Sequence, residues 1–175
     1  MSALFAAVKM IVFDVDGTLT DGGVHLGPNG EEYKRFHIAD GLGFRLAALA
    51  GVRLAIVSGR ISPAVTARMK LLDAGDVMQG VENKAVAIRS LRDRHGFTAH
   101  EVAYVGEDLN DLPAFETVSV RVAVANAAVE LKERADYVTK AAGGSGAARE
   151  LIDAVLSAKG LYDATVAAYL KEIQA

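Results

Sequence analysis

Short runs of branched apolar residues alternate along this chain with longer stretches in which apolar residues recur at helical spacing. That alternation is typical of a parallel sheet covered by helices, so it predicts an α/β fold. The predicted strands are Lys9–Phe13, Arg53–Val57, Val77–Gln79, Val102–Val105, Arg121–Ala125 and, last, Tyr137–Thr139. The predicted helices are Leu42–Ala50, Pro63–Leu72, Lys84–His95, Asp108–Phe115, Val129–Glu133, Ala147–Ser157 and Leu161–Ile173.

One segment, Gly22 to Phe36, departs from this alternation. It places Gly27, Pro28, Asn29 and Gly30 between two short runs with alternating side chains, which predicts a β-hairpin. The chain contains no internal repeat and no linker-like stretch. We therefore expect residues 1–175 to form a single domain with a hairpin at about 22–36.

The composition of the chain excludes several classes of function. The chain carries 19 Lys and Arg against 22 Asp and Glu, a net charge of −3, so it has no broad basic field for nucleic acid or an anionic membrane. No apolar run approaches the roughly 18 residues that span a bilayer, and the first residues lack the order of a secretory signal. The absence of cysteine excludes disulfides and thiolate chemistry and fits a cytoplasmic location.

Two aspartates follow directly after the first predicted strand. Asp14 and Asp16 are residues i and i+2 of an extended chain, so both carboxylates point the same way beyond the strand's carboxyl end, where open α/β sheets bind ligands. Carboxylates this close repel unless a cation lies with them, and hard oxygen ligands suit Mg²⁺. Gly17 lets the backbone turn and offer N–H groups to an anion. Taken alone, the same residues could form an ordinary polar turn.

The next three strand ends also carry polar residues, and the parallel sheet brings them to the same edge. In chain order they are Ser58, Gly59 and Arg60; Lys84; and Glu107, Asp108, Asn110 and Asp111. Each has an ordinary alternative as a helix cap, a solvated helix residue or an acidic helix start. Together, a hydroxyl, an ammonium and acids can hold a metal ion and a phosphoryl group, so we predict a site there.

These motifs resemble the haloacid dehalogenase superfamily of phosphotransferases. The matching segments are DVDGTLTDG from Asp14, SGR from Ser58, Lys84, and GEDLND from Gly106. Over nearly the whole chain the resemblance extends to the 3-deoxy-D-manno-octulosonate 8-phosphate phosphatases and their sialic-acid-type relatives. It includes YKRFHIADGLGF from Tyr33, QGVENK from Gln79, VAYVGEDLNDLPAF from Val102 and ADYVTKAAGGSGAARE from Ala135. It implies a Rossmann-like, mainly parallel sheet with helices on both faces.

The resemblance also implies roles. Asp14 would be the nucleophile that forms an aspartyl-phosphate, and Asp16 the acid and then the base, with its backbone carbonyl on Mg²⁺. Lys84 would neutralise the phosphoryl oxygens, which Ser58 and the backbone at Gly17 and Gly59 would bind. Asn110 would orient the phosphoryl group, and Asp111 would hold Lys84 or a metal-bound water. The expected reaction is magnesium-dependent hydrolysis of a sugar-acid phosphate, the octulosonate 8-phosphate step of lipopolysaccharide synthesis.

This chain departs from the family pattern at two places. Glu107 stands where the family usually has aspartate, so either Glu107, which we prefer, or Asp108 would be the metal ligand. Ser145 stands where the octulosonate phosphatases usually carry arginine, which removes a possible carboxylate anchor and brings in nine-carbon sugar-acid 9-phosphates or a broader range of substrates. Arg60 could pair with a substrate carboxylate, cap a helix or pair with a surface acid. His37 and Asp40 either meet substrate or are ordinary exposed residues.

The predicted elements fill the segments between Asp14 and Ser58 and between Lys84 and Glu107, which leaves no room for a cap domain. The resembled subgroup closes its sites with hairpins from neighbouring subunits, so we expect a homotetramer. Two functions of another class are the alternatives. A signalling receiver domain would need an aspartate after the third strand, where this chain has Gly80. A non-catalytic sugar-phosphate-binding module is disfavoured because Asp14, Asp16, Ser58 and Lys84 are all present.

Overall fold

The computed structural model describes residues 2–174, and its centre is a parallel sheet of six strands in the order β5-β4-β1-β6-β7-β8. The strands are β1 Met10–Phe13, β4 Arg53–Val57, β5 Asp76–Met78, β6 Val102–Gly106, β7 Val120–Ala123 and β8 Tyr137–Val138. A separate antiparallel pair consists of β2 His25–Leu26 and β3 Glu32–Tyr33. The parallel sheet confirms the α/β prediction.

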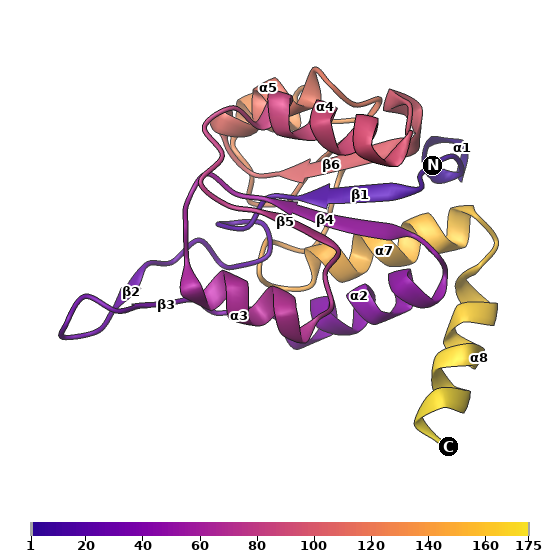
Figure 1. Ribbon diagram of the computed structural model, residues 1–175. Coiled ribbons are helices and arrows are strands. Elements are labelled where there is room, and N and C mark those ends of the chain that lie inside the picture. Colours follow the sequence, from indigo (N-terminus) through magenta and orange to yellow (C-terminus); the bar gives the residue numbers. More distant parts are fainter. Residues whose placement is uncertain (1, 175) are drawn as a thin grey trace.

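Helices cover both faces of this sheet. They are α1 Ser2–Phe5, α2 Ile38–Leu49, α3 Pro63–Leu71, α4 Lys84–His95, α5 Leu112–Phe115, α6 Val129–Lys132, α7 Ala147–Ala158 and α8 Tyr162–Ile173, with 3-10 helices at Ala99–Glu101 and Leu109–Asp111. In Figure 1, α4 and α5 lie on one face, and α2, α3 and α7 lie on the other. Helix α8 extends away from the sheet. No helix in the described part of the chain has the length and apolar character needed to cross a bilayer.

Strand β1 lies in the middle of the sheet because its sequence, MIVF, has no polar side chain to leave exposed. All four residues are fully buried, and β4 and β6 pair with it on either side. The chain passes from β1 to β4 and β5, then returns to the other side of β1 as β6. Ligands bind in open α/β sheets at such a reversal, beyond the carboxyl ends of the strands.

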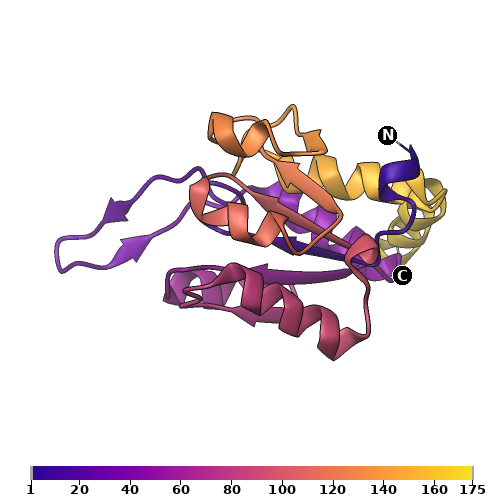
Figure 2. The ribbon, with the colours of Figure 1, turned by 90° about the horizontal axis from the view of Figure 1, so that it is seen from above.

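The predicted hairpin is confirmed. His25 pairs with Tyr33 and Leu26 with Glu32, and Gly27 N–H donates to the Glu31 carbonyl at 2.7 Å. Figures 1 and 2 show that it projects from the body of the molecule at one end of the sheet. Its root is held by an isolated antiparallel bridge between Thr20 and Phe36.

Two helix predictions need correction. Helix α2 begins at Ile38 rather than Leu42, so Gly41 lies inside the helix, where a Cβ would lie 2.7 Å from Nη2 of Arg68 in α3. A Cβ at Gly43 would lie 3.3 Å from the Cα of Arg149 in α7. The predicted helix Asp108–Phe115 is divided into a 3-10 helix and the short α5, since Asp108 caps the first of these with its own side chain.

Candidate active site

A buried lysine joins three strand ends. The Lys84 Nζ donates to Asp14 Oδ1 at 2.7 Å and to Asp111 Oδ1 at 2.6 Å. The exposed fractions of these side chains are 3% for Lys84, 6% for Asp14 and 0% for Asp111. Since a buried charge is costly without partners, this cluster needs all three groups. The structure therefore brings together three residues that the sequence analysis placed at one edge.

Local structure explains the position of Lys84. It is the first residue of α4, whose amino end is capped by Asn83, the side chain of which accepts from Val86 N at 3.2 Å. A cation is unfavourable at this end of a helix because the backbone dipole is positive there. Its two carboxylate partners supply the compensating charge. Asp14 continues the sheet beyond β1, with its N–H donating to the Val105 carbonyl at 2.9 Å.

Tyr104 completes this cluster, and the sequence analysis missed it. Its hydroxyl, in the fully buried strand β6, donates to Asp111 Oδ1 at 2.6 Å. The other oxygen of Asp111 accepts from the N–H groups of Glu107 at 2.7 Å and Asp108 at 3.2 Å. Tyr104 looked like an ordinary core residue, but a tyrosine in an otherwise aliphatic strand needs a hydrogen-bond partner when buried.

Negative charge exceeds positive charge in this cluster. Burial, followed by the charge of Asp111, raises the pKa of Asp14 to about 7, and Lys84 only partly opposes that rise. Burial opposes the charged form of Lys84, but the two carboxylates outweigh it and raise its pKa. Burial and the neighbouring Asp108 and Asp111 also raise the pKa of Glu107. One further cation would stabilise all of these carboxylates.

Asp16 lies beside a second lysine that the sequence analysis also missed. Lys34, just beyond β3, contacts Asp16 Oδ1 and also Glu32 Oε1 at 2.9 Å. Glu32 in turn pairs through its other oxygen with Arg60. Of the three open readings for Arg60, the structure therefore shows pairing with an acid near the surface. We call the four residues Asp16, Lys34, Glu32 and Arg60 the hairpin-root chain.

The remaining predicted residues occupy the loops after β1, β4 and β6. Gly17 adopts φ +78°, which favours glycine, and its N–H donates to Thr20 Oγ1 at 3.1 Å. Ser58 is buried, and its Oγ accepts from Arg60 N at 3.2 Å, while Gly59 is exposed. Asn110 is exposed on the 3-10 helix that follows β6.

The structure separates the two candidate acids after Gly106. A Cβ on Gly17 would lie 2.5 Å from the Glu107 Cδ, so the Glu107 carboxylate lies against the loop that carries Asp14 and Asp16. The Asp108 side chain instead caps its own 3-10 helix by accepting from Leu109 N at 2.8 Å. Glu107 is therefore better placed than Asp108 to act with Asp14.

The glycine-rich stretch that contains Gly143 and Gly144 packs against the loop that follows Asp16. A Cβ on Gly143 would lie 1.7 Å from the Gly17 carbonyl oxygen, so only glycine fits there. Gly144 N–H donates to the Thr18 carbonyl at 3.1 Å. Asp40 is not the ordinary exposed residue of one of its two readings. It is buried, and it accepts from Arg149 N at 2.8 Å, which caps α7.

The oxygen donors of this site suit a hard metal ion. Among the described residues, no three His, Cys, Asp or Glu side chains form a ready cluster. Mg²⁺ does not require one, because it commonly takes one or two carboxylates and keeps several waters. Burial, and after it neighbouring carboxylates, raise the pKa values of Asp14 and Glu107, and a divalent cation would stabilise both of these hard oxygen donors. The donor set of Asp14, the Asp16 carbonyl and Glu107 therefore fits Mg²⁺.

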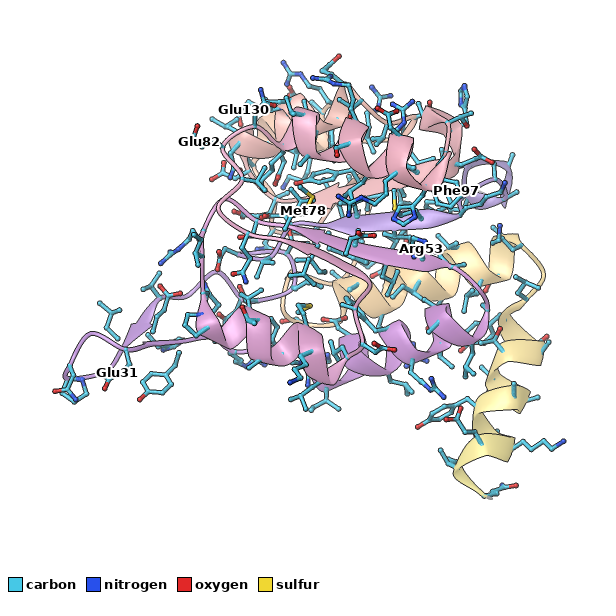
Figure 3. All side chains as sticks on the ribbon, viewed as in Figure 1. Glu31, Arg53, Met78, Glu82, Phe97 and Glu130 are labelled. Carbon is cyan, nitrogen blue, oxygen red and sulfur yellow. The ribbon has the colours of Figure 1, made fainter. Side chains whose placement is uncertain are left out.

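Figure 3 shows how the ends of the sheet differ. Met78, Glu82 and Glu130 lie toward the carboxyl ends of the strands, Glu31 is at the hairpin tip, and Arg53 and Phe97 lie toward the opposite end. A cavity of about 320 Å³ is lined at that opposite end by residues including Lys9, Arg53 and Phe97. Its lining includes none of Asp14, Asp16, Glu107 and Asp111. The site is therefore located by the chemistry of its side chains and not by the size of a cavity.

Comparisons with known proteins agree with this geometry. The family of haloacid dehalogenase-like hydrolases matches residues 71–151. The 3-deoxy-D-manno-octulosonate 8-phosphate phosphatase of Escherichia coli K12 is 43% identical over 156 residues, which cover 89% of this chain and 83% of that protein.

Two solved structures carry ligands. The Moraxella catarrhalis octulosonate 8-phosphate phosphatase, in complex with magnesium, phosphate and the sugar acid, superposes with a TM-score of 0.92 at 34% identity, covering 96% of this chain and 97% of that one. The cobalt-bound Haemophilus influenzae enzyme has a TM-score of 0.87 at 39% identity, covering 90% and 92%.

Proposed function

This chain belongs to the haloacid dehalogenase-like hydrolases, in the group of the 3-deoxy-D-manno-octulosonate 8-phosphate phosphatases, and on that premise we propose that it hydrolyses this sugar-acid phosphate with Mg²⁺ as its cofactor. The observation that carries the proposal is the buried bridge of Lys84 between Asp14 and Asp111. In this bridge, the carboxylate that we propose as the nucleophile and a fixed cation lie together near the point where the sheet reverses.

The residues divide the reaction into two steps. Asp14 attacks phosphorus, and the bond from phosphorus to the sugar oxygen breaks while Asp16 gives that oxygen a proton. Asp16 then takes a proton from water as the water attacks the aspartyl-phosphate, which releases phosphate and restores Asp14. Lys84 neutralises the phosphoryl oxygens throughout, and Ser58 Oγ and the N–H groups of the Gly17 and Gly59 loops bind them. Asn110 orients the phosphoryl group from the loop that follows β6.

Mg²⁺, when bound by Asp14, the Asp16 carbonyl and Glu107, would supply Lewis-acid stabilisation of the phosphoryl charge. Asp108 and Asp111 support this site without binding the ion. Substituting Glu107→Ala and Asp108→Ala separately tests the assignment. We expect the Glu107 variant to need far more Mg²⁺ for half-maximal activity, and the Asp108 variant to keep nearly normal Mg²⁺ dependence. The reverse order would move the ligand to Asp108.

Side-by-side hydrolysis of eight-carbon and nine-carbon sugar-acid phosphates tests the substrate. We expect the octulosonate 8-phosphate to have the highest kcat/KM, and Asp14→Asn to abolish release from every ester. A preference for the nine-carbon 9-phosphate would favour the second candidate. Ser145 is the observation behind that candidate, because it is exposed and offers no cation to the carboxylate of a substrate. The similarity to octulosonate 8-phosphate phosphatases supports an enzyme over a receiver or a non-catalytic module.

We further propose that four chains assemble and that hairpins cover neighbouring sites. Val24, Leu26 and Tyr33 of the hairpin are 55%, 69% and 60% exposed, a large apolar surface for a projecting segment. Light scattering is expected to give the mass of four chains, and Leu26→Asp should reduce it. A mass equal to one chain would end the shared-site idea. The cytoplasmic location stays a prediction from the cysteine-free sequence, which cell fractionation can check.

A further inference from the structure

Lys34 is an enclosed cation outside the Asp14 cluster. One of its partners, Asp16, is a proposed catalytic residue. Only 2% of the Lys34 side chain is exposed, although it lies at the base of a hairpin that projects into solvent. Both of its partners are carboxylates, Asp16 and Glu32. An ammonium loses its hydration on burial, so it lies here only because these two charges replace that hydration.

Lys34 contacts only one of the two carboxylate oxygens of Asp16. Lys34 binds Oδ1, while Oδ2 makes no hydrogen bond to any other residue between 2 and 174. A carboxylate held at one oxygen has a defined orientation, and its second oxygen stays available for proton transfer. On the far side, Glu32 contacts Lys34 with one oxygen and Arg60 with the other, which keeps the ammonium in place.

We propose that Lys34 is a positioning residue, which orients Asp16 so that its free oxygen serves the departing sugar oxygen and then the attacking water. This inference rests on the proposed function, because it assigns Asp16 its proton-transfer role. It means that the hairpin acts on the site of its own chain, whatever it covers on a neighbour. The Asp16 orientation is then a property of the folded hairpin root and not of the strand end alone.

The test compares two kinds of phosphate ester. An alkyl ester, such as a sugar phosphate, has a poor leaving group that needs a proton, whereas p-nitrophenyl phosphate has a leaving group that departs without one. Measured kcat/KM covers the steps up to release of the alcohol. We expect Lys34→Met to lower kcat/KM roughly 10- to 100-fold for the alkyl ester and less than about 3-fold for the aryl ester. The first loss is smaller than the roughly 10²–10⁴-fold of general acid catalysis, because Asp16 itself remains.

Arg35→Met is the matched control. Arg35 is the next residue in the same segment, also cationic, and it contacts Asp21 and the Gly144 carbonyl instead of Asp16. We expect this variant to lower kcat/KM for both esters by the same factor. If Lys34→Met does not fold, Lys34→Gln replaces it, and the alkyl ester should again lose more than the aryl ester.

Equal losses for the two esters in the Lys34 variants would overturn the inference, because they would indicate weaker phosphate binding or a looser fold. Unchanged values for both esters would overturn it as well. A wild-type chain that hydrolyses neither ester would end the proposed function, and the positioning role with it. An active wild type whose Lys34 variants lose both activities equally would instead overturn only the positioning role, so the two failures can be distinguished.

Discussion

Two buried lysines serve two aspartates that lie two residues apart, yet their surroundings differ. Lys84 lies between Asp14 and Asp111, whose side chains are 6% and 0% exposed. The three residues follow β5, β1 and β6, which belong to one sheet. Lys34 lies between Asp16 and Glu32, which are 29% and 20% exposed, and it arrives on a hairpin. The first cluster is part of the core, and the second is a contact between the core and a projecting segment.

The difference lies in which part of the fold holds each carboxylate. Asp14, the proposed nucleophile, is held by groups anchored beyond strands of the sheet. Asp16, the proposed proton-transfer residue, is held by a lysine that the hairpin supplies, so its orientation depends on the folded hairpin root. Water also screens the second cluster more strongly, so its charges contribute less to stability.

The largest effect is expected from Lys84→Met. Removing the ammonium leaves Asp14 and Asp111 buried together without compensation, which costs about 3–5 kcal/mol in the free energy of unfolding. Loss of phosphoryl stabilisation should lower kcat/KM by about 10²–10³-fold. Urea unfolding and kinetics measure both. Lys34→Met should cost only about 1 kcal/mol, so an equal loss in the two variants would contradict the comparison.

The second prediction concerns pH and the protein without metal. The pKa of Asp14 is about 7 in the folded chain, against an ordinary value of 3.8. The folded state therefore holds this proton more tightly, and the stability that Asp14 contributes is full below about pH 4 and lost as pH rises through 7. With a chelator present, raising the pH from 5 to 8 should destabilise the wild type by on the order of 2 kcal/mol more than Asp14→Asn. Parallel pH profiles would contradict it.

A smaller effect is expected from Tyr104→Phe. Asp111 loses one buried hydrogen bond, which should cost about 1–2 kcal/mol and lower kcat/KM about tenfold through Lys84. Tyr137→Phe is the control, because its hydroxyl also donates to a carboxylate, Glu150 at 2.7 Å, but away from the site. That variant should lose stability without losing kcat/KM. Equal kinetic losses would show that the effect of Tyr104 is not specific to the cluster.

The smallest effect on stability is expected from Arg60→Gln. Its pair with Glu32 is half exposed, and such pairs contribute about 0–1 kcal/mol. Thermal unfolding should therefore change little. If Arg60 can release Glu32 to bind a substrate carboxylate, KM for the sugar-acid phosphate should rise several-fold, while KM for p-nitrophenyl phosphate stays constant. A change in both KM values would place Arg60 on the phosphate instead.

Strand ends were predictable because two properties of the sequence agree there. The run MIVF has nothing polar to expose, and Asp14 follows it directly, so burial of the strand brings the carboxylate to the sheet's edge. The same reasoning places Ser58, Lys84 and Glu107 at neighbouring ends. The start of α2 was less predictable, because Gly41 marks close packing against Arg68 of α3, which no local pattern reveals.

The sequence by itself determined the order of strands and helices, the hairpin, and the set of polar residues at one edge, since apolar periodicity and strand direction are local properties. Only the tertiary structure showed that Lys34 serves Asp16, whereas the pairing of Lys84 with Asp111 was implied by the family resemblance and not by any pattern in the sequence. Lys84 and Asp111 lie 27 positions apart and Lys34 and Asp16 lie 18 apart, and no periodicity links either pair. Their pairing depends on burial, because a charge taken out of water is stable only where the fold brings an opposite charge to it.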